Sequence, residues 1–229
     1  MKEASDFPRN ASFLKRFALA LFGISVMGSG VALTAASNMG VSQISSVPYV
    51  VSLITGERLT FGTATFLLNV GFFLFQLCVY RKRFPLSQWL QLPAVAWFGF
   101  CIDMTGLLLR SAPDGPYWLL ILEVVVGSAI IALGIVFELA ADVVYLPGDG
   151  MVSTVNLFVK RNFGAVKVLF DFSLTAIAVV LSLAILQRVE GVREGTLIAA
   201  FAVGYFVRRL KCVQTFARKT TVSKESIGE

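Results

Sequence analysis

The sequence contains no histidine, and only 15% of its 229 residues are charged. Histidine is the commonest metal ligand and the side chain that titrates nearest to neutral pH, so any proton chemistry would have to use carboxylates. A soluble domain of this size would carry roughly a quarter charged residues. With 56% hydrophobic residues and a mean hydropathy of +0.77, the chain is expected to be a polytopic membrane protein folded as one domain, residues 1–229.

Several other features are scarce. The three cysteines, Cys78, Cys101 and Cys212, show no pairing pattern, so we expect reduced thiols. The sequence has no nucleophile elbow, zinc-protease motif or phosphate-binding loop, which predicts no enzymatic activity, no cofactor and no metal site. The pI of about 9.4 comes from basic runs beside apolar segments. This placement predicts contact with membrane lipids and argues against nucleic acid as a partner.

Apolar segments of about twenty residues, the length of a helix through the hydrocarbon layer, predict six membrane spans. The predicted spans are Phe17–Ser37, Gly62–Tyr80, Trp89–Leu109, Tyr117–Ala141, Val166–Leu186 and the shorter Thr196–Leu210. If the N-terminus is cytoplasmic, sixteen of the twenty Lys and Arg residues lie on the cytoplasmic side. The excess of cytoplasmic basic residues predicts that both termini lie inside.

One membrane unit is written twice in the chain. Phe61-Gly62 matches Phe163-Gly164, and Asn69 then falls on Asp171; upstream, Gly30 and Asn38 fall on Gly134 and Asp142. With three spans in each unit, the two copies would cross the bilayer in opposite senses, as in many small transporters. We therefore expect an all-α fold of two inverted three-span repeats, about 17–111 and 115–212, followed by a basic tail, 213–229.

Two apolar segments are too short to cross the membrane, and they occupy the same place in each repeat. They are Val41–Ile54 and Met151–Val159, and the second follows Pro147, Gly148, Asp149 and Gly150. Short Gly/Pro-interrupted segments at matching positions point to the binding site of a transporter. They could be re-entrant half-helices or amphipathic helices lying on the membrane surface. Asp149 could simply form a turn and cap the second segment.

Polar groups inside apolar spans are the candidate site residues, because a charge at mid-bilayer usually faces a cavity or a partner. Asp171 could bind substrate or a proton, or could form an intrahelical pair with Lys167. Glu138 and Asp142 are one helical turn apart, so joint ionisation is disfavoured and one of them could hold a proton. The candidate set is Asn38, Asn69, Asp103, Glu138, Asp142, Gly148, Asp149, Gly150 and Asp171.

Asp103 lies deep in the third span, where it could instead form a structural pair with Arg110. A rough alignment of the last spans of the two repeats places Gly99 opposite Gly204 and Asp103 opposite Arg208. The spans hold more acids than bases, which favours a cation, an organic cation or a proton as a transported species.

Several separated motifs carry a family resemblance. Leu59 to Asn69, Phe98 to Asp103, Pro147 to Gly150, Lys167 to Asp171 and Val192 to Thr196 with Gly204 resemble stretches of the YczE/YyaS/YitT-like bacterial integral membrane family. The resemblance covers about residues 17 to 210 and implies a bacterial inner-membrane protein. It implies no catalytic or binding residues.

The leading functional hypothesis is a small secondary transporter of a small molecule or cation. It would be coupled to protons through buried carboxylates, with its site at the repeat interface. A membrane scaffold or regulator that transports nothing is the alternative, and its basic tail could bind a partner or anionic lipid. A passive channel is a third possibility, and the protein could also form a homo-oligomer.

Overall fold

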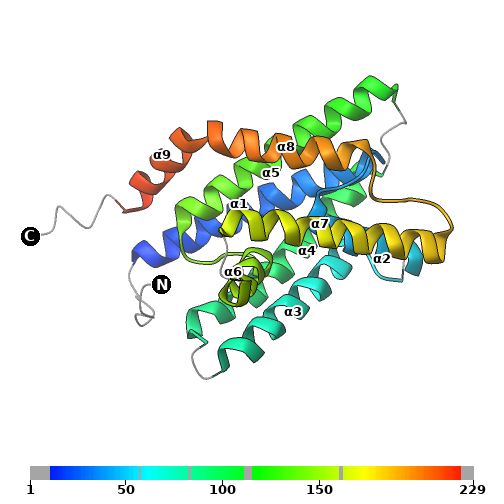
Figure 1. The fold of residues 1–229 in the computed structure, drawn as a ribbon. Helices are drawn as coiled ribbons and strands as arrows, with labels where there is room; N and C mark the ends of the chain where they lie inside the picture. The colour runs from blue at the N-terminus through cyan, green and yellow to red at the C-terminus, as the bar shows by residue number, and fades with distance from the viewer. Residues whose placement is uncertain (1–10, 57, 82–83, 111–114, 160–161, 223–229) are drawn as a thin grey trace, which may run out of the picture.

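The computed structural model describes residues 11–56, 58–81, 84–110, 115–159 and 162–222, and all regular structure in these ranges is helical. The α-helices are α1 (Ala11–Ala36), α2 (Gln43–Thr55), α3 (Phe61–Tyr80), α4 (Gln91–Leu109), α5 (Tyr117–Ala141), α6 (Pro147–Val159), α7 (Phe163–Leu181), α8 (Glu194–Arg209) and α9 (Lys211–Val222). A 3-10 turn, Leu86–Leu90, precedes α4, and a π-helical turn, Ser182–Leu186, extends α7. Figure 1 shows these helices as one elongated bundle.

Five helices, α1, α3, α4, α5 and α7, are long and apolar enough to cross a membrane. This finding supports a multi-pass membrane architecture, and the five helices correspond to five of the six predicted spans. The predicted sixth span corresponds to α8, which has 16 residues. At 1.5 Å per residue α8 is about 24 Å long, shorter than the ~30 Å hydrocarbon layer, so a sixth crossing stays a prediction.

The first helical turns are where the predicted bounds differ most from the structure. Helix α7 begins at Phe163, three residues before the predicted span, because the Asn162 side chain accepts a hydrogen bond from the Gly164 amide at 2.9 Å. Helix α3 begins in the same way, with the Thr60 side chain accepting from the Thr63 amide at 3.1 Å. Hydropathy alone does not place these helix starts, because the caps that fix them are polar residues outside the apolar run.

The centre of the bundle is an antiparallel pair formed by α1 and α5. A Cβ atom added at Gly23 would lie 2.8 Å from the Gly134 carbonyl oxygen, and one added at Gly30 would lie 2.7 Å from that of Gly127. The two backbones therefore meet along a line of glycines, as membrane helices do where small residues allow close approach. Helix α4 packs on α1, and α8 packs on α5.

The short helices α2 and α6 have 13 residues each, about 20 Å, and are too short to cross the membrane. Both pack between α3 and α7. The beginning of α1 and the end of α9 lie at the same end of the bundle, on the left in Figure 1.

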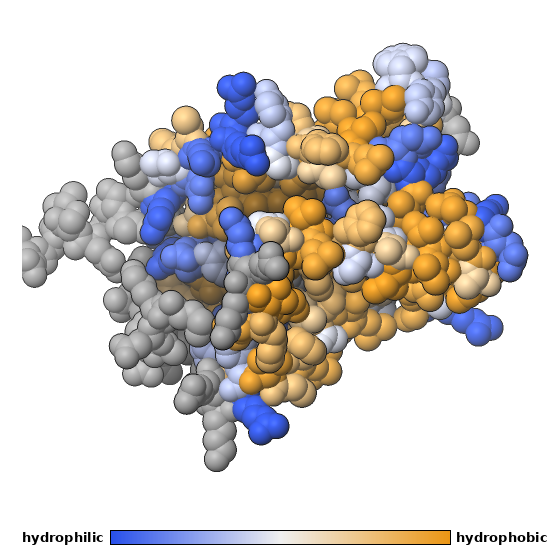
Figure 2. All heavy atoms as spheres, viewed as in Figure 1, coloured by the Kyte–Doolittle hydropathy of each residue, from blue (hydrophilic) through white to orange (hydrophobic). Residues whose placement is uncertain are grey.

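Large apolar side chains cover much of the outside, as the orange areas of Figure 2 show. Leu108 is 81% exposed, Phe201 79% and Phe172 71%. A water-soluble protein rarely exposes such large contiguous apolar areas, whereas a lipid-facing surface requires them.

Candidate functional site

The first turns of α2 and α6 meet inside the bundle. A Cβ atom added at Gly148 in α6 would lie 2.3 Å from Cδ1 of Ile44 in α2. A larger side chain at Gly148 would have to displace the end of the Ile44 side chain. The early turns are also buried, including Ser45 and Ser46 of α2 and Pro147 of α6.

Helix α6 begins four residues earlier than the predicted segment, so the Pro-Gly-Asp-Gly stretch is its first turn. Pro147 occupies the first helical position, where its missing N–H is not needed. Asp149 lies within that turn and does not precede it as a cap, which corrects the predicted capping role. An acid there is favoured by the positive end of the helix dipole.

Gln76 of α3 contacts this turn and was missed by the sequence analysis. Its Nε2 donates to the Pro147 carbonyl at 3.1 Å and to the Phe72 carbonyl at 3.2 Å, and the side chain is buried. A Cβ atom added at Gly150 would lie 2.4 Å from Oε1 of Gln76, so Gly150 provides room for the amide. A polar residue seven positions after Asn69, on the same face of an apolar span, was the available signal.

Glu138 is buried, with 6% of the residue exposed, near the end of α5. Its Oε1 accepts a hydrogen bond from the Leu146 amide at 2.7 Å, just before α6 begins. A buried carboxylate therefore holds the connection between α5 and α6, and it lies beside the first turn of α6.

Lys167 of α7 joins two carboxylates. Its Nζ lies 2.8 Å from Oδ1 of Asp149 and 3.9 Å from Oδ2 of Asp171, so the predicted Lys167–Asp171 pair forms and a third member, Asp149, joins it. Oδ1 of Asp171 is buried and has no hydrogen-bond partner among the described residues. We call Gln76, Glu138, Asp149, Lys167 and Asp171 the α6 polar cluster.

Asn69 and Asp142 lie outside these contacts. Asn69 is buried on α3, where its Nδ2 donates to the Thr65 carbonyl of its own helix at 2.9 Å. Asp142 ends α5 in the left-handed conformation, φ +50°, and its Oδ1 accepts from the Tyr145 hydroxyl at 2.5 Å. Burial, with the Asp142 carboxylate adding to it, raises the pKa of Tyr145, so this hydroxyl stays a donor.

Arg16 of α1 anchors the same end of α5. Its Nε donates to the Ala141 carbonyl and its guanidinium to the Asp142 carbonyl, each at 2.8 Å. A cation bound to the last carbonyls of a helix is favoured by the helix dipole. Asp142 therefore belongs to a capping arrangement beside the α6 polar cluster.

Asn38 and Asp103 lie at the other end of α1, away from the α6 polar cluster. They line a cavity of about 510 Å³ together with Tyr49 and Arg110. The Tyr49 hydroxyl donates to Oδ1 of Asn38 at 3.3 Å. Asp103 accepts from the Gly62 amide at 2.7 Å and from the Thr60 hydroxyl at 2.6 Å, so its carboxylate holds the start of α3.

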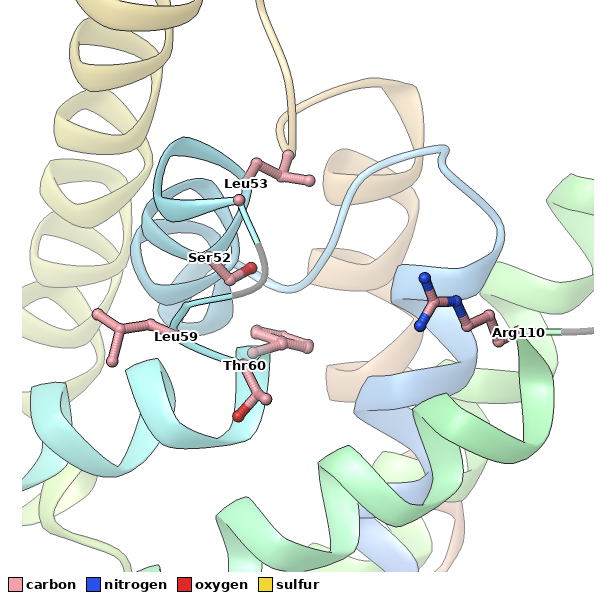
Figure 3. Close-up of a pocket in the computed structure, with 7 residues that line it drawn as sticks. Ser52, Leu53, Leu59, Thr60 and Arg110 are labelled. Carbon is pink, nitrogen blue, oxygen red and sulfur yellow. The ribbon is translucent and has the colours of Figure 1, made fainter.

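A second cavity of about 450 Å³ adjoins the first, and Thr60, Phe61 and Arg110 line both. Figure 3 shows Ser52 and Leu53 of α2 on one side of it, with Arg110 reaching from the end of α4 towards Thr60. Neither of these two cavities is lined by Asn69 or Asp171.

Seven of the nine predicted site residues thus separate into two groups, and Asn69 and Asp142 belong to neither. Glu138, Asp149 and Asp171 gather around α6 with Gly148 and Gly150, and Asn38 and Asp103 gather at the opposite end of α1. No group of three Cys, Asp or Glu residues in the described ranges is arranged to hold a metal ion.

Comparison with curated proteins found no match, and neither did comparison with solved structures. One family model matches residues 14–211. This range includes helices α2 to α8 and all of α1 except its first three residues. The YczE/YyaS/YitT relation stays a prediction. The chain belongs to the DUF6198 family, a family of unknown function.

Proposed function

We propose that the chain consists of two inverted repeats, α1–α4 and α5–α8, related by a pseudo-twofold axis through the α1–α5 contact. The glycine contacts support this proposal. If Gly30 corresponds to Gly134, the same offset relates Gly23 to Gly127. The repeat then maps the pair Gly23–Gly134 onto the pair Gly127–Gly30. Both pairs are in contact in the structure. A twofold axis between antiparallel helices requires this exchange.

The ends of the central helices and the short helices also support the repeat. Asn38 and Asp142 are matched positions, and both have left-handed backbones, with φ +52° and +50°. Helices α2 and α6 have the same length, and each packs against the α3 or α7 of the opposite repeat as well as its own. Buried first turns that meet each other favour re-entrant half-helices over helices lying on the surface.

On this basis we propose that the protein is a small secondary transporter of a small molecule or cation in a bacterial inner membrane, with both termini cytoplasmic. The observation that carries the proposal is the meeting of two half-helices beside the α6 polar cluster. Carboxylates within a membrane are costly, and they persist where they bind protons, ions or substrates. Inverted-repeat transporters place their sites at such broken helices.

The charges of the α6 polar cluster indicate the kind of ligand. Two carboxylates, Asp149 and Asp171, share one cation, Lys167, and a third acid, Glu138, is buried at the connection to α6. Oδ1 of Asp171 lacks a partner in the described part of the chain, so it is the atom open to a proton or a cation. Protonation of Asp171 would weaken its attraction to Lys167, and this supplies a coupling between proton binding and the α6–α7 contact.

The proposal is tested with purified protein in two stages. A panel of small cations, amines, amino acids and sugars is first screened by thermal shift at several pH values, and hits are then measured as flux into proteoliposomes. We expect Asp171→Asn to abolish proton-driven flux, and Asp103→Asn and Asp142→Asn to reduce it. Glu194→Gln is the control, because Glu194 is an exposed acid whose ion pair in the described part of the chain is with its neighbour Arg193. Full-rate flux in all three aspartate variants would refute the mechanism.

A further inference from the structure

The two proposed repeats differ in one contact. In the first repeat, α3 packs closely on α4, and a Cβ atom added at Gly62 would lie 2.0 Å from the Gly99 carbonyl oxygen. In the second repeat the matching glycines are Gly164 and Gly204. Among the described residues, nothing lies within 4 Å of a Cβ atom added at Gly204, and only Oδ1 of Asn162 lies near one added at Gly164.

The uncovered face of α8 is therefore the counterpart of a covered face of α4. Leu197, Phe201 and Tyr205 are exposed on α8 at helical spacing around Gly204. On α7, Val168 is 69% exposed, and its counterpart Phe66 places its Cβ atom 3.6 Å from the Cβ position of Gly99. Figure 2 shows the surface hollowed between α8 and α7, with an apolar floor.

We infer that the exposed glycine face of α8 is the docking surface for α7 of the same chain in a second conformation, in which α7 closes on α8 as α3 closes on α4 here. The inference rests on the proposed transporter function, because it identifies the contact that closes when the site changes sides. Inverted repeats that exchange their conformations are the basis of alternating access. The occupant is α7 because the established α3–α4 contact uses the matching residues of both helices.

One charge explains why the described conformation keeps α3 and α4 together. Asp103 accepts the Gly62 amide and the Thr60 hydroxyl at the positive end of the α3 dipole. Its counterpart on α8 is Arg208, a cation without an acceptor atom, which would be repelled by the positive end of α7. The α7–α8 contact should thus be the weaker of the two, and Arg208→Asp should strengthen it.

The test is disulfide cross-linking in native membranes, in a background where Cys78, Cys101 and Cys212 are replaced by serine. The test pair is Gly164→Cys with Gly204→Cys, and a second pair is Val168→Cys with Gly204→Cys; both avoid crowded positions. Ser29→Cys with Thr105→Cys is the positive control, because these hydroxyls lie 3.2 Å apart across α1 and α4. Disulfides need Cβ atoms about 3.5–4.5 Å apart, so they form only on close approach.

We expect oxidation to cross-link both test pairs within one chain, and Arg208→Asp to raise the rate several-fold. No cross-link in either pair, while the control pair reacts fully, would overturn the inference. A product of doubled mass would also overturn it, because a second copy would then be the occupant. Cross-linking does not depend on transport, so its failure is distinct from a failure of the proposed function. If the pair cross-links but flux is absent before oxidation, the transporter proposal alone fails.

Discussion

Because α1 packs closely on α5, changing glycine to alanine should affect stability differently at two kinds of position. One kind is a glycine at the contact between the two helices, and the other is a glycine with open space beside it. At Gly134, an added Cβ atom would lie 2.5 Å from the Gly23 carbonyl oxygen and 2.6 Å from the Met27 amide nitrogen. Both neighbours are backbone atoms, so the helices themselves must separate to accept Gly134→Ala. At Gly71 in α3 and Gly106 in α4, no described atom lies within 4 Å of an added Cβ atom.

The magnitude follows from two opposing terms. Alanine is favoured over glycine by about 0.8–1 kcal/mol inside a helix, and this gain applies at all three positions. Overpacking a close contact costs about 1–3 kcal/mol, and this cost applies only at Gly134. Because the helix term cancels in the comparison, Gly134→Ala should be less stable than Gly71→Ala by about 1–3 kcal/mol, or about 2–12 °C in Tm for a chain of this size.

The measurement is thermal unfolding of the purified variants in one detergent, followed by tryptophan fluorescence. We expect Gly71→Ala and Gly106→Ala to melt at or above the parent Tm, and Gly134→Ala to melt below them. Gly30→Ala should resemble Gly134→Ala, because a Cβ atom added at Gly30 would lie 2.7 Å from both the Gly127 carbonyl oxygen and the Ile131 amide nitrogen. Equal Tm values for Gly134→Ala and Gly71→Ala would refute the close approach of α1 and α5.

Three further predictions concern polar contacts. Asp103→Ala removes the acceptor of two hydrogen bonds at the start of α3 and should lower the free energy of unfolding by about 1–3 kcal/mol. An unchanged unfolding curve would contradict these contacts. Gln76→Leu leaves a buried α6 carbonyl without its side-chain donor and should cost about 1–3 kcal/mol, measured in the same assay. Lys167→Met should destabilise the protein more than Asp171→Asn, because it leaves two carboxylates without their shared cation while Asp171→Asn leaves the pair with Asp149 intact. The Lys167 prediction fails if the order of the two Tm values is reversed.

Long apolar runs predicted the five helices that are long enough to span a membrane, since a span must be about twenty apolar residues long wherever it occurs. The span Tyr117–Ala141 agrees with α5 at both ends. Helix α8 was harder to predict from hydropathy, because it is shorter than the other predicted spans and begins with Glu194 and Gly195. Its packing against α5 is a property of the folded chain that hydropathy does not measure.

The candidate site was predictable as a set of residues but not as an arrangement. An acid within an apolar span singled out Glu138 and Asp171 as candidates without any geometry. The division into two groups depends on which ends of α1 and α5 meet, and sequence spacing does not give this. Gln76 was missed because its partner, the Pro147 carbonyl, is a backbone atom that leaves no trace in the sequence.

The opposite orientation of the two repeats is tested most directly by the sidedness of Asn38 and Asp142. Each is changed to cysteine in the background free of other cysteines, and whole cells are treated with a membrane-impermeant maleimide before and after permeabilisation. We expect Asn38→Cys to be labelled from outside in intact cells, and Asp142→Cys to be labelled only after permeabilisation. Labelling of both cysteines from the same side would contradict the inverted repeat, and with it the proposed transporter.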